Sequence, residues 1–113
     1  MTRIYKLLGA GEWAAAQAAG RFEGSEVDRR DGYIHFSTGA QVAETARRYF
    51  TGRDDLVLLG LDAEPLGEAL KWEPSRGGDL FPHLYVPLEV GGVDEMRSIP
   101  LAVDGTPQLG ETP

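Results

Sequence analysis

The sequence contains no cysteine, which excludes disulfides, thiolate zinc sites and cysteine nucleophiles. It also lacks any apolar run close to the ~20 residues that a transmembrane helix needs. The first residues include no long apolar stretch of the kind found in signal peptides. We therefore expect a cytoplasmic protein without a membrane partner.

Basic residues are scarce: 11 Lys and Arg stand against 18 Asp and Glu, a formal net charge of −7. This balance argues against a nucleic-acid partner, because phosphate binding needs clustered positive charge. The charge is uneven, since residues 1–53 carry 8 basic and 6 acidic side chains and residues 54–113 carry 3 and 12. The first half can therefore accept a small anionic ligand, although acidic loops that keep the protein soluble explain the same distribution. Nothing in the sequence identifies a protein partner.

The hydrophobic pattern predicts one domain over residues 1–103 and a frayed polar tail over residues 104–113. One helix is predicted over residues 12–19 and a second from Thr38 to Gly52. Thr38 is the predicted N-cap of the second helix, and Gln41 completes its capping box. The segment 21–30 is predicted to be a loop with short extended pieces. Strands are predicted at residues 4–8, 33–37, 56–61, 70–75, 84–90 and 96–103.

Two of these strands have a predicted place in a sheet. Residues 56–61 are almost continuously apolar, which is typical of a central strand buried on both faces. Pro100 places the last strand at a sheet edge, because proline cannot donate to a ladder. Early helices followed by a run of strands predict an α+β fold.

Residues 9–14, Gly-Ala-Gly-Glu-Trp-Ala, match the dinucleotide-binding pattern G-x-G-x-x-A between a predicted strand and a predicted helix. In that motif an acidic residue at the end of a second strand, about 20 residues on, holds the ribose. Here Glu26 and Asp28 follow no apolar strand. We therefore interpret the pattern as a plain glycine turn at a helix entry.

The chain has two histidines, His35 and His83, and each lies beside aromatic residues. On the predicted strand His35 shares a face with Tyr33 and Ser37. With Thr38 at the next helix entry, this face predicts a site for an anion or a carbonyl oxygen, where His35 can give or take a proton. The alternative is a partly buried histidine beside a structural cap.

His83 follows Pro82, which fixes the local backbone, and the conformationally free Gly77 and Gly78 precede it. The segment predicts a rigid site wall with a mobile flap, or else a turn packed on the core. A metal site formed by both histidines with Glu73 or Asp79 has no supporting ligand spacing, and we predict no metal.

Glu73 directly follows Trp72, which places a carboxylate beside a large aromatic ring. In an apolar cleft the pKa of such a glutamate is raised, and the group can serve in proton transfer or hold a ribose hydroxyl. The alternative is an exposed glutamate on the outer face of a strand whose tryptophan is in the core.

Several segments together resemble the bacterial family called domain of unknown function 952, over residues 3–100 or so. They are Ile-Tyr-Lys at 4–6, Asp-Gly-Tyr-Ile-His-Phe-Ser-Thr at 31–38 with Gln41, the apolar strand at 56–62, Trp-Glu-Pro-Ser at 72–75, and Leu-Phe-Pro-His-Leu-Tyr at 80–85. This family has no established activity. Its fold is grouped with the ADP-ribosylation fold, in which a split pair of small mixed or antiparallel sheets grips NAD in a cleft.

The resemblance implies an ADP-ribosylation-like α+β domain with about two helices in its N-terminal half and a nucleotide- or NAD-like cleft. It implies ADP-ribosyl or other glycosyl transfer, or hydrolysis, with NAD as the candidate substrate and no certain cofactor. Ser37-Thr38 resembles the strand motif of that fold, and Glu73 or Glu89 would be its late glutamate. A non-catalytic module that kept the small-ligand cleft is the alternative.

The residues and the resemblance together predict one cleft with His35 and His83 on opposite walls. Catalytic roles are predicted for His35, Glu73 and His83. Ligand contacts are predicted for Ser37, Thr38, Trp72, Arg76 and Tyr85.

Overall fold

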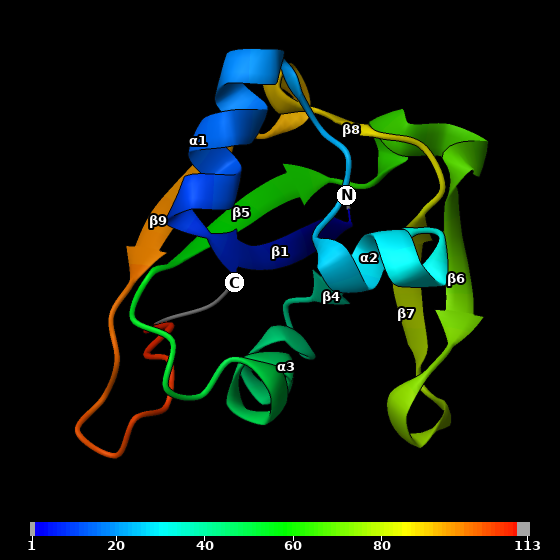
Figure 1. Cartoon of the computed structure of the whole chain (residues 1–113). Coiled ribbons are helices and arrows are strands. Elements are labelled where there is room, and N and C mark those ends of the chain that lie inside the picture. The colour runs from blue at the N-terminus through cyan, green and yellow to red at the C-terminus, as the bar shows by residue number, and fades with distance from the viewer. Residues whose placement is uncertain (1, 111–113) are drawn as a thin grey trace.

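The computed structural model describes residues 2–110, apart from the side chain of Arg76. Its helices and strands form the predicted α+β architecture (Figure 1). Every strand pairing among the described residues is antiparallel. The described part contains three α-helices and three short 3₁₀ segments, more helix than the two predicted.

The central sheet has the strand order β4-β1-β5-β9. Its strands are β1 (Arg3–Gly9), β4 (Ser37–Thr38), β5 (Leu56–Asp62) and β9 (Glu95–Ile99). Residues 56–61 of β5 are all buried, which confirms a central strand covered on both faces. The strand β9 lies at the sheet edge, as predicted, and ends at Ile99, just before Pro100.

Two helices cover the opposite faces of this sheet, α1 (Ala10–Ala19) and α3 (Val42–Tyr49) (Figure 1). Because side chains alternate along β5, Leu59 packs in the core under α1 and Leu58 in the core under α3. Trp13 anchors the first helix, and Val42 and Ala46 anchor the second. The central sheet therefore fills the middle layer of three.

The entry to α1 confirms the rejection of a dinucleotide-binding motif. The Gly9 N–H donates to the Glu12 carboxylate at 3.0 Å, and the Ala10 N–H donates to the Asp55 carbonyl at 2.7 Å. These donors are the groups that would cradle a pyrophosphate. The strands β1 and β5 are also antiparallel, whereas the dinucleotide-binding unit is parallel.

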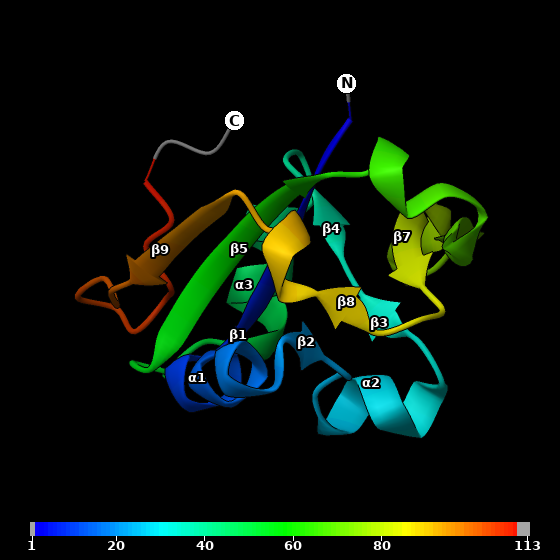
Figure 2. The ribbon, with the colours of Figure 1, turned by 90° about the horizontal axis from the view of Figure 1, so that it is seen from above.

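A second sheet, which we call the histidine sheet, stands beside the central one (Figure 2). It contains β3 (Ile34–His35), β7 (Leu80–Leu84) and β6 (Leu70–Pro74) in the order β3-β7-β6. A two-stranded ribbon pairs β2 (Arg21–Phe22) with β8 (Leu88–Glu89). The 3₁₀ segments are η1 (Glu64–Ala69), η2 (Arg76–Gly78) and η3 (Val90–Gly92).

The predicted strand 33–37 is in fact two strands in two sheets. His35 ends β3 and Ser37 begins β4, and the buried Phe36 between them donates its N–H to the Pro82 carbonyl at 3.0 Å. A run of alternating side chains cannot show that the chain changes partner in its middle. This crossing brings the histidine sheet against the central sheet.

Four other boundaries differ from prediction. Residues 21–30 contain a short extended piece as expected, β2, but they also contain most of a helix that was not predicted, α2 (Glu26–Asp31). Thr38 is not a helix N-cap, because it pairs with Ile4 in β4 and α3 begins at Val42. The strand predicted at 84–90 is divided, since Leu84 ends β7, which starts at Leu80, and Leu88–Glu89 form β8. The strand predicted at 96–103 stops at Ile99.

The C-terminal segment was predicted to fray from residue 104, yet up to Gly110 it folds back on the domain. Leu101 bridges to Pro107, and Leu109 is buried in the core under α3. The Leu109 carbonyl accepts a hydrogen bond from Arg97 at 2.9 Å. No helix within residues 2–110 has the length and apolar character needed to cross a membrane.

Candidate functional site

A cleft of about 720 Å³ lies between α2, α3 and the first strand of the central sheet. Its lining includes three of the predicted site residues, His35, Ser37 and His83. It also includes Lys6 and Tyr33, which were not predicted as site residues. The site therefore gathers residues from the central sheet, the histidine sheet, and the helices α2 and α3.

The two histidines are neighbours on one wall, so the prediction of opposite walls is wrong. His35 on β3 pairs with His83 on β7, and paired residues of antiparallel strands point to the same face. Their ring centroids are 5.5 Å apart. Tyr33 stacks on His83 at 4.1 Å and lies 4.7 Å from His35. The three rings form one compact group, which we call the ring cluster.

Asp28 on α2 is the hub beneath the ring cluster, and only 3% of it is exposed. Its carboxylate accepts from Lys6 Nζ at 2.8 Å, from the Ser25 N–H at 2.9 Å, and from the His35 N–H at 3.1 Å. His35 Nδ1 lies 2.6 Å from the same carboxylate. Burial alone would raise the pKa of Asp28, but the hydrogen bonds from His35, Lys6 and Ser25 outweigh it and hold the pKa far below its usual value.

Lys6 is the buried cation of this hub. It lies on β1 with 6% exposure, and its Nζ is 6.0 Å from the centroid of Phe22. Burial lowers the pKa of Lys6, and the Asp28 carboxylate opposes that shift. The pair fixes α2 against the central sheet.

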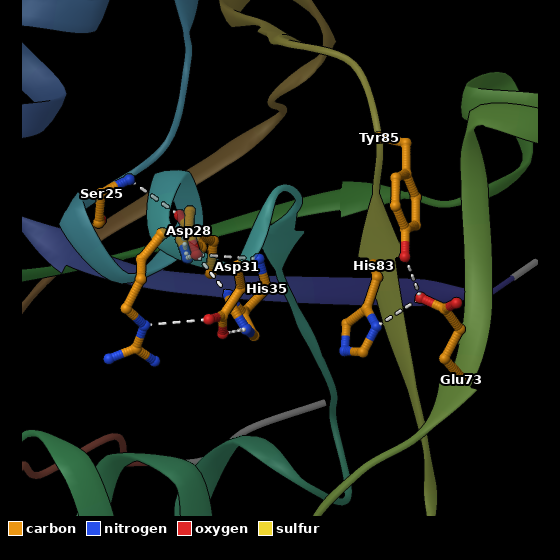
Figure 3. Close-up of polar contacts among 9 residues, drawn as sticks. Ser25, Asp28, Asp31, His35, Glu73, His83 and Tyr85 are labelled. Atoms are coloured by element: carbon orange, nitrogen blue, oxygen red, sulfur yellow. Dashed lines mark hydrogen bonds and ion pairs between the residues drawn. The ribbon is translucent and has the colours of Figure 1, made fainter.

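His35 is bound between two carboxylates (Figure 3). Besides the contact of Nδ1 with Asp28, its Nε2 lies 3.0 Å from Asp31 Oδ2. The Arg30 guanidinium, helped by His35, holds the pKa of Asp31 below its usual value. A histidine ring can donate to both carboxylates only as the imidazolium, since neutral imidazole has a single N–H.

His83 belongs to a different chain of contacts (Figure 3). Its Nδ1 lies 2.8 Å from Glu73 Oε1, and the Tyr85 hydroxyl donates to the same oxygen at 2.7 Å. Hydrogen bonds from Tyr85 and then His83 lower the pKa of Glu73, which corrects the prediction that its pKa is raised. The same contact raises the pKa of Tyr85 to about 12. Glu73 therefore points at His83 and Tyr85 rather than into the cleft.

The structure does not bring all predicted ligand contacts together. Trp72 alternates with Glu73 on β6, so its side chain, 40% exposed, lies on the other face of the histidine sheet. Thr38 is held in β4 and donates its N–H to Gln41 Oε1 at 3.0 Å. Ser37 does line the cleft, buried and 3.0 Å from the Thr45 hydroxyl. The side chain of Arg76 lies outside the described part of the structure.

The prediction missed four residues of the site: Lys6, Asp28, Asp31 and Tyr33. A signal for Asp28 was present, because Ser25-Glu26-Val27-Asp28 fits the capping-box pattern and the structure contains that box. Tyr33 shares the predicted face with His35 and could have been included on that ground. Lys6 carries no local signal, since only tertiary contacts place it at the site, whereas Asp31 lies four residues before His35 in the chain.

A metal ion and an anionic ligand are two groups that such a site could hold. Within residues 2–110, no cluster of three or more His, Asp or Glu side chains has an arrangement that could hold a metal ion. Arg30 and Arg53 line the cleft and carry the positive charge that an anionic ligand requires, although Arg30 is paired with Asp31 and Arg53 with Asp55.

The fold and the site define a small α+β domain with antiparallel sheets and a pair of carboxylate-bound histidines. The chain belongs to the family described as Protein of unknown function (DUF952), which it matches over residues 7–96. No curated protein matches the chain.

The chain is also similar to solved structures of protein CC0527 from Caulobacter crescentus. Its crystal structure is 58% identical with a TM-score of 0.94, and the match covers 96% of this chain and 95% of that one. The solution NMR structure of the same protein is 59% identical with a TM-score of 0.88, covering 97% and 95%. The match to the family model over residues 7–96 confirms the predicted family.

Proposed function

We propose that the cleft binds a nucleotide-like small molecule, with NAD as the candidate, and supports transfer or hydrolysis at its ribosyl carbon. The observation that carries the proposal is the ring cluster, in which Tyr33, His35 and His83 lie on one wall of the cleft. Flat aromatic and imidazole surfaces suit a base or a nicotinamide ring. A volume of about 720 Å³ lies within the usual range of small-molecule sites.

The arrangement of two sheets with a cleft beside them is in keeping with the ADP-ribosylation-like fold that the resemblance implies. In that fold the bond between the ribosyl carbon and nicotinamide breaks through an oxocarbenium-like state. An acceptor hydroxyl or water then bonds to the carbon and loses its proton to a base. His83 is a candidate base, because a carboxylate orients its ring.

Isothermal titration calorimetry with NAD, ADP-ribose and nicotinamide tests the proposal. We expect heat with NAD or ADP-ribose, and at least tenfold weaker binding in His83→Ala. Trp72→Ala is the matched control, since Trp72 lies in the same sheet on the opposite face, and it should bind as the unchanged protein does. If none of the three compounds gives heat, the NAD proposal is wrong.

A non-catalytic binding module is the second candidate function. It is favoured by one observation: Glu73, the predicted catalytic carboxylate, is directed at His83 and Tyr85 rather than into the cleft. This alternative predicts ligand binding without nicotinamide release at any pH. Nicotinamide release that disappears in Glu73→Gln would rule it out.

A further inference from the structure

We infer that the two histidines have different tasks: His83 accepts the proton of the acceptor hydroxyl or water through Nε2, and His35 is a positioning residue that takes no proton in the reaction. This inference deepens the proposed function and rests on it. The sequence gives no reason to separate the two, since both imidazoles lie in similar apolar and aromatic segments. The separation comes from which ring nitrogens the protein already uses.

Both ring nitrogens of His35 face protein carboxylates. Nδ1 lies 2.6 Å from Asp28 and Nε2 lies 3.0 Å from Asp31, and both carboxyl groups have lowered pKa values. Neither nitrogen is therefore left to accept a proton from a ligand. The backbone N–H of His35 also donates to Asp28, which fixes the strand together with the ring. What His35 presents to the cleft is the edge of a ring that two carboxylates hold in place.

His83 differs from His35, because only one of its ring nitrogens contacts a carboxylate and the other can accept a proton. Its Nδ1 is used by Glu73, which directs Nε2 to the side of the ring away from that carboxylate (Figure 3). His83 lines the cleft although only 3% of it is exposed, and the stacked Tyr33 holds the plane of its ring. In histidine-dependent catalysis one ring nitrogen commonly acts as the base while a carboxylate bound to the other nitrogen orients the ring. Tyr85 in turn holds the Glu73 carboxylate in place.

The proton-transfer step balances without any further reagent. The O–H bond of the acceptor hydroxyl or water breaks, its proton bonds to the Nε2 lone pair, and the oxygen bonds to the ribosyl carbon. The bond from that carbon to nicotinamide breaks, and its electron pair neutralises the positive ring nitrogen of nicotinamide. The resulting imidazolium is stabilised by the Glu73 carboxylate until it releases the proton to solvent.

Nitrogen-15 NMR of the histidine rings tests the inference without any ligand. Because the chain has two histidines, His35→Gln and His83→Gln each assign the remaining ring unambiguously. Neutral His83 should carry its proton on Nδ1 and leave Nε2 bare, whereas His35 should show N–H signals at both nitrogens. In Glu73→Ala the His83 tautomers should shift toward the Nε2–H form. Trp72→Ala, on the other face of the sheet, should change neither ring.

A wild-type His83 that carries its proton on Nε2 with Nδ1 bare would overturn the inference, even if NAD binds. A His35 with a bare nitrogen would overturn it too. Absence of NAD binding together with the expected tautomers would refute the NAD proposal alone. Where nicotinamide release is measurable, His83→Gln should lower its rate by about 10²-fold or more. His35→Gln should lower it less and leave the shape of its pH profile unchanged.

Discussion

Removal of the Asp28 charge tests whether the hub under the ring cluster holds the domain together. Asp28→Asn keeps the size of the side chain but leaves the buried Lys6 ammonium without its counter-charge. Breaking one side of a buried ion pair in this way costs about 3–5 kcal/mol. Lys6 can escape by losing its proton, which costs about 4–5 kcal/mol at pH 7 from a reference pKa of about 10.4. The two routes therefore agree on a loss of about 3–5 kcal/mol in the free energy of unfolding.

Urea unfolding followed by the fluorescence of the buried Trp13 measures this loss. With an m-value of about 1–3 kcal/mol per molar urea, the midpoint should fall by about 1–5 M. Lys6→Met should cost less, about 1–3 kcal/mol, because Asp28 keeps its hydrogen bonds from His35 and Ser25. The double variant should lose less than the sum of the two single losses.

Asp31→Asn is the matched control. It also removes a carboxylate from His35, but at the surface, so the urea midpoint should stay nearly unchanged. If Asp28→Asn costs under about 1 kcal/mol, or no more than the control, then the hub does not stabilise the domain and the reasoning fails.

Three further outcomes follow from the structure. The pKa of Asp28 is depressed in the folded protein, so its contribution to stability is complete above the unfolded pKa of about 3.9 and is lost as the pH falls through the folded value. Urea midpoints measured from pH 6 downward should therefore fall with acid, and they should fall less steeply in Asp28→Asn than in the unchanged protein. Gly60→Ala should cost about 1 kcal/mol in thermal unfolding, because its Cβ would lie 3.2 Å from the Glu95 Cβ and would push the Glu95 carboxylate, 2.7 Å away, off Arg3. Gly11→Ala, in α1 with nothing within 4 Å, should instead stabilise by about 0.5 kcal/mol, and the opposite order would contradict this packing argument.

The fold was predictable where local pattern decides it. The strand β5 is an unbroken apolar run, and α1 is rich in alanine and ends at a left-handed Gly20, so both were expected from the sequence. The helix α2 was missed because its residues 26–31 are almost all charged, and its stability comes from contacts of Asp28 with distant groups. The split at Phe36 was missed because alternation looks the same whether a strand has one partner or two.

The sequence predicted some of the residues that form the site, but it did not predict how they are arranged. The sequence by itself determined that both histidines lie on strand-like segments beside aromatic rings, because side-chain alternation is a local property. The tertiary structure decided that β3 pairs with β7, which sets His35 beside His83 on one wall rather than across a cleft. It also decided which nitrogens remain available, because Asp28 and Asp31 come from α2 and Glu73 from β6. Although these partners lie within ten residues of their histidines, their contacts depend on strand register and helix placement, which no local pattern specifies.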